Sequence, residues 1–105
     1  MVLEEDIVKY ALALPDVSEC MEKGVRIFRR GERIFMVLEP GTKPLRVQMR
    51  CERNLSKTLQ GRYESVMESR ALGRGGIEVI CSGQLEHDEI IDLVRHGYEM
   101  SAPEE

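Results

Sequence analysis

The chain has 105 residues, of which 42% are hydrophobic and 32% are charged, and its formal net charge at pH 7 is −4. This length suits a single domain spanning 1–105, and the composition is typical of a globular protein and not of a disordered one. No uncharged stretch approaches the roughly 18 residues that a membrane span needs. Three acids, Glu4, Glu5 and Asp6, interrupt any secretory leader at the start of the chain. We therefore expect no membrane partner.

The cysteines favour a reducing environment. Cys20, Cys51 and Cys81 lie about thirty residues apart and form no C-x-x-C pair. Such spacing predicts free thiols and a cytoplasmic location. It also argues against a metal cluster, because only His87 and His96 are available to complete one. We expect no metal and no cofactor.

The hydrophobic pattern predicts both helices and strands. Apolar residues recur at helical spacing near both ends of the chain, and Pro15 ends the first helix. Alternation over Leu45–Arg50 indicates a strand, and Gly31-Glu32 is typical of a type II′ turn between two further strands. The segment 16–24 is expected to be a polar link, and 101–105 a frayed tail. The predicted elements are a helix over 2–14, strands over 25–30, 33–39 and 45–50, a helix over 52–60, a short edge strand over 65–67, a strand over 77–81 and a helix over 85–100.

This order of elements predicts an α+β fold. Short turns join the strands, so strands that are neighbours in the sequence pair in antiparallel fashion. The expected architecture is a single antiparallel sheet of four to five strands, with the N-terminal and C-terminal helices packed on one face.

Charge is distributed unevenly along the chain. Residues 23–74 hold thirteen Lys or Arg and five acids, whereas residues 1–22 have a net charge of −5 and residues 75–105 a net charge of −7. Most of the central cations are Arg, the side chain that makes forked contacts with phosphate. The middle of the chain is therefore the candidate region for binding an anionic partner.

The predicted hairpin arranges several of these cations on one face. Pairing across the turn places Arg30 opposite Arg33 and Phe28 opposite Phe35, and leaves a second, apolar face formed by Val25, Ile27, Ile34, Met36 and Leu38. Cations that follow a nucleic-acid backbone and rings that stack on bases form a nucleic-acid-binding platform. The candidate residues for binding nucleic acid are Arg26, Arg30, Arg33, Arg46, Arg50, Arg74, Phe28 and Phe35.

The same residues fit a second interpretation. Phe28 and Phe35 are more typical of a core than of an exposed platform, and acidic helices can neutralise the arginines within the fold. An exposed sheet edge or apolar face would then bind a protein, a peptide or a second copy of the chain. The sequence leaves monomer and homodimer open.

No catalytic motif accompanies these features in the sequence. The glycine-rich segment 73–76 lacks the Lys-Ser/Thr of a phosphate-binding loop and precedes a strand. His87 and His96 are nine residues apart and so lie on opposite sides of the last predicted helix. Cys51 or Cys81 would need a histidine brought close by the fold to act as a nucleophile. We expect a non-enzymatic binding protein without catalytic residues.

The order and spacing of several motifs resemble the MmcQ/YjbR-like family of small bacterial proteins, from about Ile7 to Met100. ALALPDV at 11–17 is similar to the end of the family's first helix, and IFRRGERIFMVL at 27–38 to its hairpin. The strand and short helix over 45–59 continue the likeness, and IEVI, DEIIDLV and GYE near the C-terminus resemble the family's last strand and last helix. Two positions depart from the pattern: Ile77 replaces an aromatic residue, often Trp, and Gly97 replaces a Ser.

The resemblance implies an α+β fold related to secretion-chaperone-like domains. It also implies a DNA-binding role that rests on structural likeness and on no established activity. It implies no catalytic residues.

Overall fold

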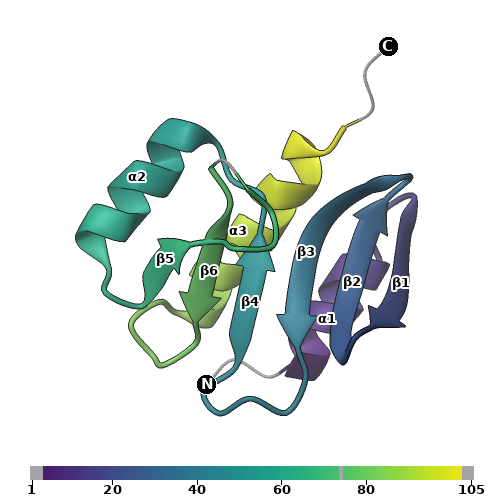
Figure 1. Cartoon of the computed structure of the whole chain (residues 1–105), viewed down its shortest axis with the longest axis horizontal. Helices are drawn as coiled ribbons and strands as arrows, with labels where there is room; N and C mark the ends of the chain where they lie inside the picture. Colours follow the sequence, from purple (N-terminus) through teal and green to yellow (C-terminus); the bar gives the residue numbers. More distant parts are fainter. Residues whose placement is uncertain (1–3, 74, 103–105) are drawn as a thin grey trace.

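The computed structural model describes residues 4–73 and 75–102. Within these residues no helix has both the length and the hydropathy to span a bilayer. The elements, labelled in Figure 1, are α1 (Glu4–Leu12), β1 (Val17–Glu22), β2 (Val25–Arg30), β3 (Arg33–Glu39), β4 (Arg46–Met49), α2 (Arg53–Arg62), β5 (Val66–Glu68), β6 (Ile77–Ile80) and α3 (His87–Met100).

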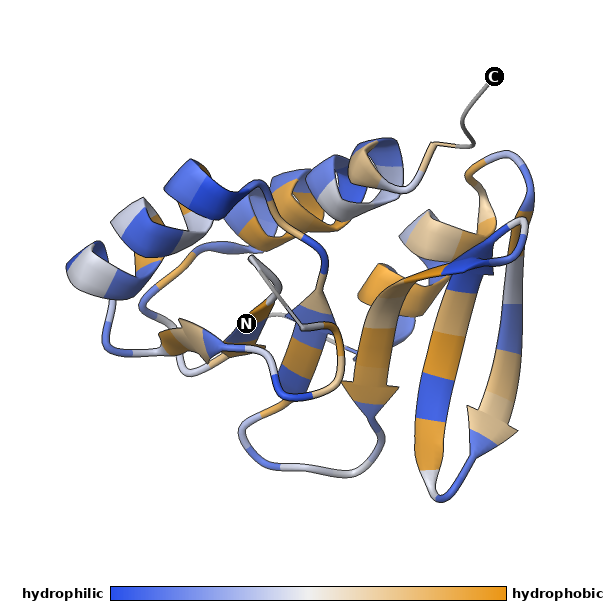
Figure 2. Cartoon of the chain, turned by 45° about the horizontal axis from the view of Figure 1, so that its top comes forward, coloured by the Kyte–Doolittle hydropathy of each residue, from blue (hydrophilic) through white to orange (hydrophobic). Residues whose placement is uncertain are grey.

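The strands form one sheet in the order β1-β2-β3-β4-β6-β5, and every neighbouring pair is antiparallel. Helices α1 and α3 pack together on one face of this sheet, and α2 lies beside β5 (Figure 1). The hydrophobic residues of α3 face the sheet and its hydrophilic residues face outward (Figure 2). The predicted α+β class, with terminal helices on one face, is confirmed. The sheet has one strand more than the upper limit of the prediction.

The additional strand is β1, which lies in the segment predicted to be a polar link. It pairs along its whole length with β2 across the two-residue turn Lys23-Gly24. Both turn residues have positive φ, 53° and 82°, as a type I′ hairpin turn requires. Lysine is uncommon at positive φ, so the turn carries little signal in the sequence.

The pairing of β2 with β3 differs from the predicted one. Arg30 does pair with Arg33, and Gly31 has φ of +61° as the predicted turn requires. Beyond the turn the register shifts between Phe28 and the next residue, so Phe28 faces Met36 and not Phe35. This β-bulge adds one residue to β3 and changes which side chains share a face.

As a result, the core lies on the face that was predicted to carry the arginines. Directly opposed residues of antiparallel strands point to the same side, so Met36 joins Phe28 beneath the helices. The predicted core residues Val25, Ile27 and Ile34 are only partly buried and lie on the other side of the sheet. The fully buried hydrophobic residues are Ile7, Ala11, Phe28, Phe35, Met36, Leu38, Val47, Met49, Ile77, Val79, Ile90 and Val94.

Helix α3 approaches the sheet most closely at Gly97. A Cβ atom at this position would lie 2.9 Å from the carbonyl oxygen of Arg50 and 3.3 Å from that of Phe35. Backbone atoms of β3 and of the residue directly after β4 therefore occupy the space that a side chain would need. This contact favours glycine at position 97.

Candidate functional site

The two rings of the predicted platform lie in the core. Phe28 and Phe35 are each 0% exposed, beneath α1 and α3. The Phe35 ring meets the Tyr98 ring edge-on, with 5.7 Å between their centroids. A ring without exposed surface cannot stack on a base, so the predicted water-facing position of both phenylalanines is wrong. The bulge in the hairpin and the two helices on that face are the physical reasons.

Arg26 lies under α1 and is neutralised within the fold. Its Nη1 lies 2.9 Å from a carboxylate oxygen of Glu4, and its Nε donates to Glu19 of β1. Hydrogen bonds to Glu19 and then to Glu4 raise the pKa of Arg26, although partial burial opposes them. This arginine links α1 to two strands and adds little positive charge to the surface.

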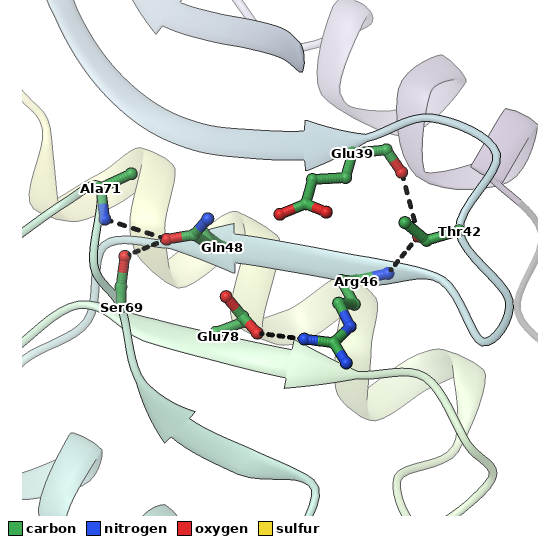
Figure 3. A network of polar contacts seen from close by, with 7 residues as sticks. All are labelled: Glu39, Thr42, Arg46, Gln48, Ser69, Ala71 and Glu78. Atoms are coloured by element: carbon green, nitrogen blue, oxygen red, sulfur yellow. Dashed lines mark hydrogen bonds and ion pairs between the residues drawn. The ribbon is translucent and has the colours of Figure 1, made fainter. Parts of the chain in front are cut away.

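Arg46 lies on the opposite side of the sheet. No helix of the described residues packs on this side, which is called the open face below. Its Nη1 lies 3.3 Å from Oε2 of Glu78, a residue that is only 8% exposed (Figure 3). The neighbouring Gln48 side chain accepts hydrogen bonds from the Ser69 hydroxyl at 2.6 Å and the Ala71 amide at 3.1 Å. The segment after β5 thus covers this part of the open face, and Glu78 balances the charge of Arg46.

Three of the predicted arginines gather at one end of the sheet, where β2 ends, β3 begins and β4 ends. Arg30 lies 4.0 Å over the Tyr98 ring and donates to the Tyr98 carbonyl at 3.0 Å. The Nε of Arg50 donates to the carbonyl oxygen of Ile34. Arg33 is exposed and pairs with Arg30 in the hairpin.

The predicted basic sheet surface is therefore divided. Arg26 and Arg46 are held by acids on two different faces, and only Arg30, Arg33 and Arg50 share one location. Arg74 lies outside the described residues, so the structure does not place it.

A cavity of about 940 Å³ opens at the other end of the sheet, between the β3–β4 loop, the β6–α3 loop and α1. Most of its lining is apolar. Three of its polar side chains already serve the fold: Glu4 holds Arg26, Thr42 donates to the Glu39 carbonyl, and Glu86 caps α3. The remaining polar side chains in the lining are those of Lys43, Ser82 and His87, and the His87 ring lies near Asp6 and Asp88.

The thiols and histidines do not form a nucleophile–base pair. Burial raises the pKa of Cys51 and of Cys81 to about 11. The His96 ring accepts a hydrogen bond from the backbone amide of Glu52 at 3.0 Å, and the His87 ring faces aspartates. Among residues 4–73 and 75–102, no hydrogen bond joins a histidine to a cysteine.

The two edge strands of the sheet differ in length, and a helix packs beside one of them. At one edge β5 has three residues, and α2 packs beside it. At the other edge β1 has six residues, and β2 is the only strand of the described residues with which it pairs (Figure 1). The segment 16–24 has the pattern of a polar link, so this surface could not be predicted from the sequence.

Backbone groups of alternate β1 residues point away from the sheet. The turn closes on the pair Glu22–Val25, and at the far end the Gly31 amide donates to the Asp16 carbonyl at 2.9 Å. Hydrogen-bonded pairs alternate along an antiparallel ladder, so the even-numbered residues of β1 bond to β2. The residues whose N–H and C=O groups are directed outward are Val17, Glu19 and Met21.

The acids of β1 protect this edge only weakly by charge. Glu19 is bound by Arg26, and Glu22 lies 3.3 Å from the Nη2 of Arg29. Exposed edge strands commonly use unpaired charges to repel other strands. Here arginines of β2 balance both carboxylates, while the neighbouring Met21 is 59% exposed. We call this surface, Val17–Glu22 with its outward backbone groups, the β1 edge.

Comparison with known proteins supports the fold. No family model matches the sequence, and no curated protein matches it. The crystal structure of a Deinococcus radiodurans protein with the DUF419 domain superposes with a TM-score of 0.84 at 18% identity, covering 95% of this chain and 78% of that one. This chain has the fold of a DUF419 protein. DUF419 is the MmcQ/YjbR-like family, so the resemblance seen in the sequence is supported at the level of the fold.

A second solved structure, that of a protein from Pseudomonas syringae, is also similar to this chain. It matches with a TM-score of 0.78 at 14% identity, covering 96% of this chain and 100% of that one. At such identities the likeness establishes the fold and assigns no activity, because one fold serves many functions.

Proposed function

We propose that this chain is a non-enzymatic protein-binding module of the MmcQ/YjbR-like family, and that it accepts an extended strand of a protein partner along the β1 edge. The observation that carries the proposal is the row of outward backbone groups at Val17, Glu19 and Met21, which no residue of 4–73 or 75–102 covers with a further strand, beside acids already bound by arginines. Three free cysteines support a reducing, cytoplasmic setting for this activity.

Strand addition matches the chemistry of this edge. Main-chain hydrogen bonds supply affinity in this binding mode, and side chains on the two faces supply specificity. A partner strand would meet Met21 on the face covered by helices and Ser18 and Cys20 on the open face.

A proline at the β1 edge tests the proposal. Met21→Pro removes one outward N–H and leaves the β2 ladder unchanged, whereas the control Met21→Ser keeps that N–H and shortens the side chain equally. The probe is a capped hexapeptide of alternating Thr and Val, titrated by amide chemical shifts. Loss of one hydrogen bond, with the ring blocking close approach, is expected to weaken binding about ten-fold in the proline variant and less than about two-fold in the control. Equal binding by both variants would contradict strand addition at this edge.

Nucleic acid is a second candidate partner, favoured by the cluster at the end of the sheet. The guanidinium groups of Arg30 and Arg50 donate hydrogen bonds to backbone carbonyls, which do not cancel their charge. Arg53 and Lys57, at the start and middle of α2, are exposed and add positive charge. Contacts of this kind would be made with phosphates and would weaken steeply as salt rises.

Titration of labelled single- and double-stranded DNA separates the two candidates. If nucleic acid binds, its affinity falls with salt, and Arg53→Gln with Lys57→Gln lowers the slope of log affinity against log salt by about 2. Met21→Pro leaves this affinity unchanged. No binding at low salt, or binding insensitive to salt, would eliminate the second candidate.

A further inference from the structure

We infer that the strand received by the β1 edge is β1 of a second copy of this chain, in a two-fold symmetric antiparallel pair. The inference rests on the proposed function and names the partner. The axis would run perpendicular to the sheet, because antiparallel pairing about such an axis keeps the helices of both copies on the same side. The two sheets would then form one continuous sheet.

The pleat of the strands restricts the possible registers. Opposed residues must point to the same side, and outward backbone groups must meet outward groups, so odd-numbered residues face odd-numbered residues. Both conditions are met only when the two-fold axis passes beside one residue of β1, so that this residue faces the same residue of the second copy. Such a register is said to be centred on that residue. Of these, the registers centred on Glu19 and on Cys20 pair five residues of β1 in each copy.

Charge favours the register centred on Cys20. Centring on Glu19 would place two carboxylates directly opposite each other, which is unfavourable. Centring on Cys20 places Ser18 opposite Glu22 of the second copy, where the hydroxyl can donate to the carboxylate. It also places Glu19 opposite Met21 of the second copy, so no like charges are opposed. We therefore assign this register.

Exposed apolar side chains lie on the elements at this edge. Met21 is 59% exposed, and Leu12 near the end of the packed helix α1 is 44% exposed. Met21 points to the face covered by helices, because it pairs with Arg26, which contacts α1. A second copy placed beside β1 would bring its own α1 to the same side and remove apolar surface there from water.

In this register, formation of a disulfide between the two Cys20 residues would report that the two copies have paired. Cys20 would face Cys20 of the second copy at a position without direct backbone hydrogen bonds, where Cα atoms are about 4.5 Å apart. A disulfide spans Cα separations of about 4.4–6.8 Å, so the two thiols can be linked. Cys20 is partly exposed on the open face, with its Sγ 2.9 Å from the Nη1 of Arg29. Burial keeps Cys51 and Cys81 protonated, with pKa about 11, and therefore slow to react.

Sedimentation and chemical oxidation test the inference. The apparent mass of the full chain should rise toward that of a dimer as the protein concentration increases. Because Met21→Pro removes one outward N–H from each copy, the pair loses two hydrogen bonds, and about a hundred-fold more protein should be needed for Met21→Pro than for Met21→Ser. Diamide, which accepts two electrons and two protons as two thiols form a disulfide, should convert the wild type to a dimer joined at Cys20. Cys20→Ser should give no linked dimer, while Cys51→Ser should react like the wild type. A monomer at every concentration, or linkage at equal rates in both Met21 variants, would overturn self-pairing.

The peptide titration distinguishes failure of this inference from failure of the proposed function. If the chain stays monomeric but binds the Thr/Val peptide, and Met21→Pro abolishes that binding, the β1 edge accepts a different protein and only the identity of the partner is wrong. If the peptide does not bind either, strand addition itself is rejected.

Discussion

Phe35→Ala is expected to lower the free energy of unfolding by about 3–5 kcal/mol, since it empties a ring-sized volume in the core. Phe35 is 0% exposed, and its ring packs edge-on against Tyr98. The substitution therefore loses the transfer free energy of the ring and leaves a cavity between β3 and α3. Urea unfolding followed by circular dichroism measures the change, read from the midpoint at constant slope.

Met21→Ala is the matched control, because Met21 is a large apolar side chain on the same side of the sheet but is 59% exposed. We expect this control to change stability by less than about 0.5 kcal/mol. If Phe35→Ala were equally mild, the ring would not be a core residue, and its predicted role in a nucleic-acid platform would regain support.

The second large effect is expected at Gly97, where Gly97→Ala should destabilise the chain by about 1–3 kcal/mol. The added Cβ would lie 2.9 Å from the Arg50 carbonyl and 3.3 Å from the Phe35 carbonyl. Both are backbone atoms, one in β3 and one directly after β4, so α3 must move away from the sheet to relieve the contact. The shift in thermal midpoint reports the loss, and amide chemical shifts in α3 report the displacement.

Gly61→Ala is the matched control, and it is expected to raise the stability of the chain, whereas Gly97→Ala lowers it. Gly61 lies within α2, and a Cβ there would meet nothing within 4 Å. Alanine should stabilise this exposed helix by about 0.5–1 kcal/mol, since glycine loses more conformational freedom on folding. Stabilisation by Gly97→Ala as well would show that α3 does not approach the sheet as closely as described.

Periodicity in the sequence was sufficient to predict most elements of the fold. The helices and the strands from Val25 onward follow strong patterns, because each buries one face against the core. β1 reads Val-Ser-Glu-Cys-Met-Glu, with polar residues on both faces, since an edge strand buries little. Its turn places Lys23 at positive φ, where Asn or Gly would have given a clearer signal.

One extra residue in β3, at the β-bulge, decides which face of the sheet forms the core. Without the bulge beside Phe28, the alternation assigns the phenylalanines and the apolar residues Met36 and Leu38 to opposite faces. With the bulge they share one face. Alternation with a period of two residues does not reveal where such an extra residue occurs. The prediction therefore placed two phenylalanines that are buried on the same exposed surface as the arginines.

The partners of the arginines were beyond sequence reasoning for a similar reason. Arg26 meets Glu4, 22 residues earlier, and Arg46 meets Glu78, 32 residues later. The uneven charge along the chain, which suggested an anionic ligand, reflects in part these internal ion pairs between acidic termini and a basic centre. Arg30, Arg33 and Arg50 do come together, because β2, β3 and β4 bring their ends to one side.

Amide hydrogen exchange along β1 tests the central claim most directly. In dilute solution the amides of Val17, Glu19 and Met21 should exchange almost freely, while those of the even-numbered residues between them are protected by β2. At high protein concentration, or with the strand peptide, the three outward amides should slow by at least about ten-fold. Equal protection of odd- and even-numbered amides in dilute solution, or outward amides that never slow, would show that this edge is not an open binding strand.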